Sequence, residues 1–383
     1  MDDKQVRQLL ISILAEAVCP SRSAATANDI GPETLISVYQ LAKKHDLSHV
    51  VAAYVHENKI EVSPELGAAL KQDAFLSVYR CERLKYTLKE ICDALEAATI
   101  PHIPLKGSEI RPYYPQESMR TSCDIDILIH EEDLDAAIQA LESKGYRCGE
   151  RHYHDVSLYS PGQVHLELHF NILENNVSLD TVLQDAWQYA ECVQGSRYAF
   201  RKEFFVFHMY AHMAYHFLAG GCGLRSLMDI WVMEHNMDAP YSCAEDLLKK
   251  AGIYQFAAEM SRITDSCFAG QAKDVLADQV LQYIFCGGVY GTKGNAVGIY
   301  RSQNSGMAKY WLERIFLPYR SMVIAYPVLK KAPWLLPVYW VVRWFKALFG
   351  GKTGRLAAEI ASANNVSAEQ IAQTKDICSR LGL

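Results

Sequence analysis

Apolar residues follow helical spacing at both ends of the chain and strand spacing only in its middle. Residues 4 to about 75 carry apolar positions three and four apart, which predicts short helices. A more regular amphipathic pattern predicts a helix over about 78–97. Helical spacing returns from about 179 to 290, and the stretch 203–218 is apolar nearly all round. We therefore expect that last helix to be buried.

The middle of the chain interleaves short strand patterns with helices. Extended runs are predicted at 102–106 and 124–129, and the second alternates polar and apolar residues. A helix is predicted over 131–144. Two further strands, at about 151–159 and 164–170, are joined by a Ser-Pro-Gly-Gln turn and should form a hairpin. Together these elements predict a small mixed sheet.

The length of 383 residues exceeds that of a typical single domain. We expect an α+β protein in which a small mixed-sheet core, residues 78–195, lies between two helical regions. The N-terminal helical region is residues 1–77, and the C-terminal one is residues 196–383. A composition of 50% hydrophobic and 21% charged residues is typical of a globular protein.

Three acidic side chains are predicted to line one face of this sheet. Asp124 and Asp126 are two residues apart on one strand, so both project from the same face. Glu167 and His169 share a face of a later strand. Neighbouring carboxylates repel, and a divalent cation such as Mg²⁺, which prefers hard oxygen ligands, can offset that repulsion. Three acids could hold two ions, as in many phosphoryl and nucleotidyl transfers; for Glu167, a solvated strand position is the alternative.

The residues Lys106, Gly107 and Ser108 end the first predicted strand and precede a helix or turn. A glycine there lets backbone N–H groups approach a phosphate, and a helix N-terminus favours the negative charge. Lys106 could add a positive charge to a triphosphate site. The motif is too short to indicate a function by itself. It is informative because it precedes the two acidic strands in the sequence.

That order resembles the DNA polymerase beta-type nucleotidyltransferase superfamily, in which hydrophobic-Gly-Ser precedes Asp-x-Asp on the next strand and a third carboxylate on a later one. Many members have Asp as that third acid, where this chain has Glu167. More closely, residues 80–235 resemble a bacterial family of uncharacterised nucleotidyltransferases. The motifs that carry this resemblance are Leu105-Lys106-Gly107, Tyr114-Pro115, Arg120, Asp124 to Leu128, Glu167-Leu168-His169, and Leu224-Arg225 with Leu227 and Asp229.

The resemblance implies transfer of a nucleoside monophosphate from an NTP to an acceptor, with Mg²⁺ or Mn²⁺ as cofactor and release of pyrophosphate. Asp124, Asp126 and Glu167 would hold the metal and carry catalysis. Residues expected near the nucleotide are Lys106, Gly107, Ser108, Arg120, His169 and Arg225. The acceptor stays open among small molecules, lipids, proteins and RNA. A catalytically silent module that binds a nucleotide or a protein on the same fold is the alternative.

Three histidines, His208, His212 and His216, lie four apart on one predicted helix face. This spacing can bind a metal, although the sequence lacks the glutamate of the HExxH motif. Core packing and lining of a substrate pocket are the other two interpretations. A metallohydrolase built on this cluster is a third candidate for the function.

The net charge of −6 hides a basic segment at 301–355, which has ten Lys or Arg residues, one acid and four of the six tryptophans. Basic and aromatic residues in this mixture are typical of a helix on anionic lipid, and also of a fringe around a polyanion-binding cleft. Peripheral membrane contact and polyanion contact are therefore both predicted as alternatives.

The eleven cysteines are scattered, with no CxxC pair, which suits a reducing compartment. The first residues lack the basic and apolar regions of a secretory signal. We expect a cytoplasmic protein, or one peripheral to the membrane.

Overall fold

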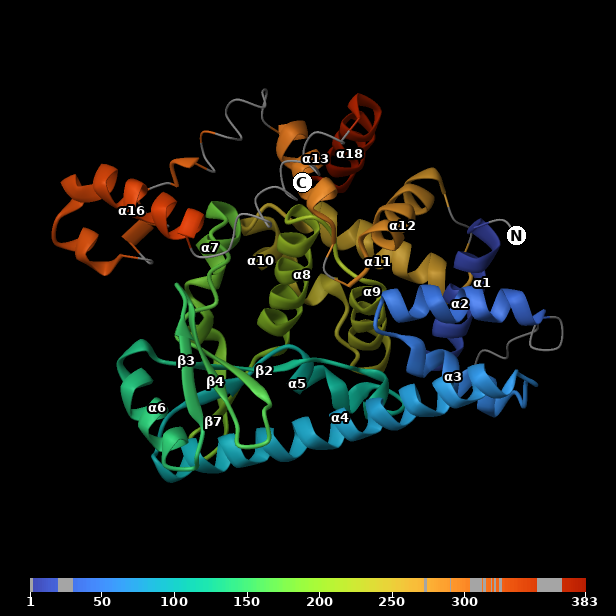
Figure 1. Cartoon of the computed structure of the whole chain (residues 1–383), viewed down its shortest axis with the longest axis horizontal. Helices are drawn as coiled ribbons and strands as arrows, with labels where there is room; N and C mark the ends of the chain where they lie inside the picture. The colour runs from blue at the N-terminus through green and yellow to red at the C-terminus, as the bar shows by residue number, and fades with distance from the viewer. Residues whose placement is uncertain are drawn as a thin grey trace.

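The computed structural model describes residues 3–19, 30–271, 274–289, 291–303, 326–349 and 367–383, with isolated positions between 312 and 323. The fold is α+β, as predicted: a seven-stranded mixed sheet has helices before and after it in the chain (Figure 1). Of the basic segment 301–355, only 301–303, 326–349 and those isolated positions are described.

Four helices precede the sheet, and the last of them is the longest described element. They are α1 (Asp3–Val18), α2 (Pro32–Lys44), α3 (Ser48–Glu57) and α4 (Pro64–Ala97). The sequence predicted only the second half of α4. The helix begins earlier because Ser63 accepts a hydrogen bond from the Leu66 amide and Pro64 occupies the first turn, both of which favour a helix start. The boundary predicted between the N-terminal helical region and the core, at residues 77 and 78, therefore falls inside α4.

The sheet has the strand order β3-β4-β5-β2-β1-β7-β6. Neighbouring strands β2 and β5 are parallel, as are β1 and β7, and the other neighbours are antiparallel. The predicted hairpin is confirmed as β4 and β5. The strands are β1 (His102–Pro104), β2 (Asp124–Ile129), β3 (Arg147–Arg151), β4 (Asp155–Tyr159), β5 (His165–His169), β6 (Ala190–Gln194) and β7 (Arg197–Phe200).

One face of the sheet is apolar and packs on helices. Ile125 and Ile127 of β2 and Leu166 of β5 belong to a buried cluster with residues of α4 and of α6 (Leu134–Glu142). Figure 1 shows α4 running along the bottom of the view, beneath the sheet. Because successive strand residues point to opposite faces, burying these residues turns the intervening polar side chains to the other face.

The strands β6 and β7 were not predicted, since the sequence favoured helix from about residue 179. They form a short antiparallel hairpin whose turn includes Gly195 at φ +55°, a conformation that favours glycine. Glu96 of α4 stabilises this turn by accepting a hydrogen bond of 2.6 Å from the Ser196 amide. The boundary predicted between the core and the C-terminal helical region, at residues 195 and 196, lies in this turn.

Most helices after β5 pack against the N-terminal ones through the larger apolar core, to which α16 contributes none of its described residues. The predicted buried helix is confirmed as α8 (Lys202–Leu218). The others are the short α7 (Val177–Leu183), α9 (Leu224–Trp231), α10 (Glu245–Lys250), α11 (Tyr254–Phe268), α12 (Val275–Gly287), α13 (Lys293–Gln303), α16 (Leu336–Phe349) and α18 (Ala368–Leu381). Within the described ranges no helix is long and apolar enough to cross a membrane.

Candidate functional site

The parallel pairing of β2 and β5 brings the three predicted acids together. In this register Asp126 is the partner of Glu167 and Asp124 is the partner of His165, on the polar face of the sheet. His169 lies two residues beyond Glu167 on the same face. The sequence predicted which face each acid would occupy, and the register places all three on adjacent positions.

Two positive groups lie against Asp126. The Lys106 ammonium is 3.6 Å from Asp126 Oδ1, and His169 Nε2 is 3.0 Å from the same oxygen. His169 Nε2 is also 3.5 Å from Glu167 Oε2. Burial alone would raise the pKa of Asp126, but these two neighbours hold it well below its usual value. Conversely, burial opposes protonation of His169, yet its hydrogen bonds to Asp126 and Glu167 raise its pKa to about 9.

Asp124 is in the opposite situation. Burial, followed by the charges of Asp126 and Glu167, raises the pKa of Asp124. Among the residues that the structure describes, none forms an ion pair with its carboxylate. The sequence analysis considered only repulsion between the carboxylates. In the structure Lys106 and His169 compensate the charge of Asp126, whereas the charge of Asp124 has no ion-pair partner among the described residues.

The donor atoms fit a divalent metal. Asp124, His165 and Glu167 offer ligand atoms within 4.8 Å of one another, and so do Asp126, Glu167 and His169, although His169 must lose its proton to serve as a ligand. Glu167 belongs to both groups, so its two oxygens could serve two neighbouring ions. Carboxylate oxygens are what Mg²⁺ and Mn²⁺ prefer, and a bound cation would lower the energy of the crowded charge at Asp124.

Lys106 has an unusual backbone conformation, with φ 47° and ψ −112°. A side-chain-bearing residue in this region of φ/ψ space stores about 1–3 kcal/mol of strain, and such strain concentrates at functional sites. The conformation turns the chain from β1 into α5 (Gly107–Ile110) and leaves the Lys106 side chain beside Asp126. Glycine would adopt this conformation more easily than lysine does.

Ser108 does not join the carboxylates. It lines a different cavity of about 440 Å³, together with Lys85, Arg111 and Arg197. These three cations already have partners: carboxylates for Lys85 and Arg197, and oxygens of Arg120 and Ser122 for Arg111. The helix that begins at Gly107 is a single turn. Of the predicted phosphate loop, Ser108 therefore lies away from the three acids, whereas Lys106 lies beside Asp126.

Arg120 and Arg225 belong to a buried network next to the site. Arg120 Nε donates to Asp229 Oδ1 at 2.7 Å, and the Tyr114 hydroxyl donates to the same oxygen at 2.6 Å. Both arginines also donate to the Thr121 carbonyl, at 2.7 and 3.0 Å. These contacts join the loop before β2 to α9, so they hold the acidic strand in place. The donors with printed partners, Nε and Nη1 of Arg120 and Nη1 of Arg225, bind protein oxygens, and contact of either arginine with the nucleotide stays a prediction.

We expect Arg120→Met to destabilise the fold by about 3–5 kcal/mol, because it leaves the Asp229 carboxylate buried without its ion-pair partner. The control is Lys89→Met, which breaks the exposed pair with Asp93 and should change the stability far less. Urea denaturation of both variants measures the difference. Equal losses would show that the network adds nothing to stability.

The three histidines of α8 line a pocket beside the acids. The pocket has a volume of about 170 Å³, and its walls include Lys106, Glu167, His169, Glu174, His208, His212, Tyr215 and His216. Burial and then the charge of Lys106 lower the pKa of each histidine, to about 3 for His208 and about 4 for His216. All three are neutral near pH 7. They line the pocket, and none belongs to a group of three close metal ligands among the described residues.

Glu174 was missed by the sequence analysis. It lies in the irregular segment after β5, where no periodicity or motif marks it. His212 Nδ1 is 3.1 Å from Glu174 Oε1, and burial raises the pKa of Glu174 to about 7. A carboxyl group that titrates near neutral pH, in the same pocket as Lys106 and Glu167, is suited to proton transfer.

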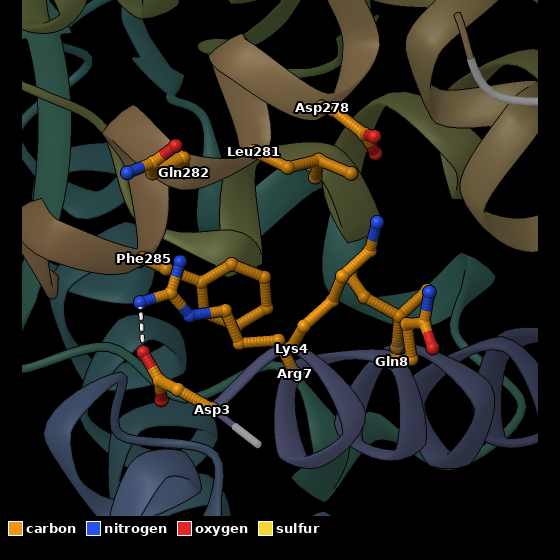
Figure 2. Close-up of a pocket in the computed structure, with 9 residues that line it drawn as sticks. Asp3, Lys4, Arg7, Gln8, Asp278, Leu281, Gln282 and Phe285 are labelled. Atoms are coloured by element: carbon orange, nitrogen blue, oxygen red, sulfur yellow. Dashed lines mark hydrogen bonds and ion pairs between the residues drawn. The ribbon is translucent and has the colours of Figure 1, made fainter. Parts of the chain in front are cut away.

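Another cavity, of about 350 Å³, lies between α1 and α12 and is lined by both polar and apolar side chains (Figure 2). Arg7 pairs with Asp3 and lies with its guanidinium 5.6 Å from the Phe285 ring centre. The two carboxylates that line this cavity, Asp3 and Asp278, belong to no group of metal ligands found among the described residues. The cavity therefore lacks the chemistry of the sheet site.

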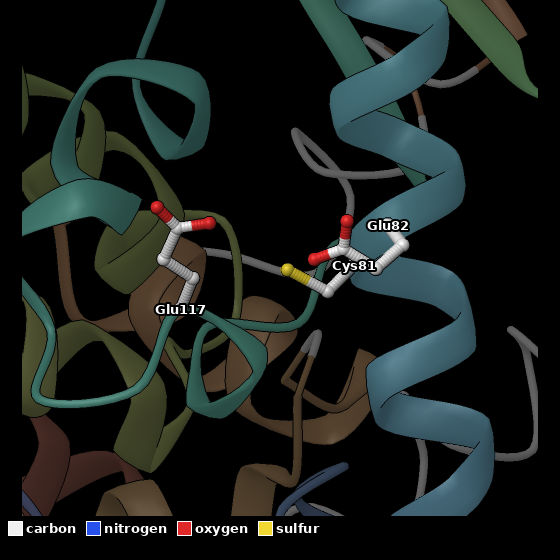
Figure 3. Close-up of side chains that lie close together, drawn as sticks. All are labelled: Cys81, Glu82 and Glu117. Atoms are coloured by element: carbon white, nitrogen blue, oxygen red, sulfur yellow. The ribbon is translucent and has the colours of Figure 1, made fainter.

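A third cluster of possible ligands, Cys81, Glu82 and Glu117, joins α4 to the loop before β2 (Figure 3). The Lys85 ammonium lies 3.3 Å from Glu82 and 2.5 Å from Glu117, and so already forms an ion pair with each of them. Burial raises the pKa of the Cys81 thiol, which disfavours the thiolate that a metal needs. This cluster is therefore better described as a structural ion pair.

The fold and the sheet site define a protein with strand-borne carboxylates beside a lysine, facing a small polar pocket. The chain belongs to the family described as uncharacterised nucleotidyltransferase, whose sequence model matches residues 34–269. This range contains all the predicted site residues, and the family implies an NTP substrate. No curated protein and no solved structure matches the chain.

Proposed function

We propose that the protein is a metal-dependent nucleotidyltransferase of the DNA polymerase beta type, which transfers a nucleoside monophosphate from an NTP to an acceptor and releases pyrophosphate. The observation that carries the proposal is the adjacent placement of Asp124, Asp126 and Glu167 across the parallel pair β2 and β5. Family membership supports the reaction class, and the metal and acceptor remain part of the proposal.

Each residue has a role that follows from its position. Asp124, Asp126 and Glu167 would hold Mg²⁺ or Mn²⁺, which when bound neutralises phosphate charge and activates the attacking oxygen. Lys106 is close enough to the carboxylates to bind a phosphate oxygen beside them. The acceptor oxygen forms a bond to the α-phosphorus, and the bond from that phosphorus to the oxygen bridging it to the β-phosphorus breaks. Pyrophosphate leaves with the bonding electrons.

The acceptor hydroxyl must also lose its proton. Glu174 is the proton acceptor in this proposal, since it lines the pocket and is hydrogen-bonded to the neutral His212. The charges that act on it come from Lys106, His169, Asp180 and Asp126. The pocket histidines would contact the acceptor and exclude bulk water, which strengthens the electrostatic interactions there.

Proton transfer to Glu174 predicts a pH dependence. A base acts in its ionised form, so kcat/KM should rise with pH and level off above an apparent pKa near 7. We expect Glu174→Gln to lower the rate at pH 8 about 100-fold and to remove that limb of the profile. Glu109→Gln is the matched control, because Glu109 is also buried with a raised pKa but pairs with Arg197 instead. A Glu174→Gln profile identical to the wild type would exclude Glu174 as the base.

The rival function, a silent module that binds without turnover, makes a different prediction. Calorimetry with ATP, GTP, CTP and UTP, with and without Mg²⁺, measures binding, and pyrophosphate release measures turnover. The enzyme should bind one nucleotide in a metal-dependent way and release pyrophosphate when an acceptor is present. Tight binding with no turnover in cell extract would favour the module.

A further inference from the structure

The helix α16 (Leu336–Phe349) has an exposed apolar face. Trp334, just before the helix, is 75% exposed, and Val338, Val341 and Phe345 are 54%, 42% and 56% exposed. Their spacing of four, three and four residues places all of them on one side of a helix. Figure 1 shows α16 at the left edge of the molecule.

An adjacent side of α16 is held by contacts within the chain. The indoles of Trp340 and Trp344 donate hydrogen bonds of 2.9 Å to the carbonyls of Leu317 and Ile315. The ring of Phe316 meets both indoles edge-on, at 5.1 and 5.2 Å between ring centres. These contacts cover the tryptophan-bearing side of the helix, while the side that carries Val338, Val341 and Phe345 stays exposed.

The stretch of sequence that carries this face has charges of one sign. Lys330, Lys331 and Lys346 are exposed, and the sequence has no Asp or Glu between Glu313 and Glu359. An apolar face flanked by exposed lysines, with no acid to repel anionic headgroups, has the charge pattern that anionic lipid attracts. The helix is too short and too polar to cross the bilayer, so it would lie in the interface.

We infer that α16 and Trp334 form a docking surface for an anionic lipid membrane, which the protein uses as a peripheral anchor. Nucleic acid fits less well, because Val338 and Val341 at the centre of the face cannot stack on bases, whereas they can insert between acyl chains. Tryptophan at its edge suits the headgroup region. This inference does not depend on the proposed chemistry.

The test uses the full-length protein in sedimentation with vesicles of phosphatidylcholine, with and without phosphatidylglycerol. We expect binding only to the anionic vesicles. Trp334→Ser combined with Phe345→Ser should weaken it about tenfold, because these side chains supply most of the exposed apolar area. Phe75→Ser is the matched control: Phe75 is a 69% exposed aromatic on α4, and its loss should leave binding unchanged.

A second variant tests the contribution of the lysines. Lys330→Glu with Lys331→Glu should also weaken vesicle binding, and high salt should do the same. Circular dichroism of each variant checks that the fold is retained. The inference is overturned if the wild type does not bind anionic vesicles, if the Trp334 and Phe345 changes leave binding intact, or if the segment instead retains RNA with no dependence on the apolar residues.

Discussion

Asp124→Asn should abolish nucleotidyl transfer and leave the folded protein at least as stable as the wild type. The loss of a metal ligand removes several kcal/mol of transition-state stabilisation, so we expect kcat/KM to fall by at least about 1000-fold. Stability should hold because folding raises the pKa of Asp124. An acid with a raised pKa destabilises the fold once it is ionised, above its unfolded pKa, and the neutral amide removes that cost. Pyrophosphate release and thermal unfolding measure the two effects.

The matched variant for this prediction is Asp126→Asn. It should also abolish transfer, but it leaves the buried Lys106 without its carboxylate partner and His169 with Glu167 alone, so its melting temperature should fall. An Asp124→Asn protein that unfolds more readily than Asp126→Asn would contradict the electrostatic description of the site. Retention of full activity in either variant would show that these acids do not hold the catalytic metal.

Lys106→Gly should inactivate the enzyme and destabilise it less than loss of the charge alone would. Glycine adopts the left-handed conformation at this position freely, which relieves about 1–3 kcal/mol of strain and offsets part of the cost of leaving Asp126 without its ion-pair partner. The loss of the charge that binds phosphate should lower kcat/KM about 100- to 1000-fold. Steady-state kinetics and urea denaturation on the same preparation give both quantities.

Lys106→Met is the control that separates strain from charge. Methionine keeps the strained backbone and an apolar stem but removes the ammonium group. It should be as inactive as Lys106→Gly and less stable. If the methionine variant is active, the positive charge is not required and Lys106 serves only to shape the turn after β1.

The sequence predicted the acidic face of the sheet well, for a simple reason. Alternation in Asp124 to Ile127 and in His165 to His169 determines which side chains share a face, whatever the strands pair with. The parallel register that puts Asp126 opposite Glu167 could not be predicted, because it depends on how the intervening helix and hairpin pack on the sheet.

Other parts of the site leave no local pattern. Glu174 lies in irregular chain and meets His212 only through the packing of α8 against β5. Nothing in the motif at Lys106 to Ser108 shows that a left-handed turn would keep Lys106 with the acids and place Ser108 in another cavity. The hairpin of β6 and β7 was missed because two strands of four and five residues are too short for periodicity to separate them from helix.

The most direct test of the central proposal is transfer of label from α-labelled NTPs to an acceptor in cell extract, catalysed by the purified protein. Wild-type protein should give one labelled product with equimolar pyrophosphate, and both should vanish when EDTA removes the metal and when Asp124→Asn replaces the wild type. Labelling that persists at the wild-type rate in Asp124→Asn would contradict the assignment of the sheet site as the catalytic centre.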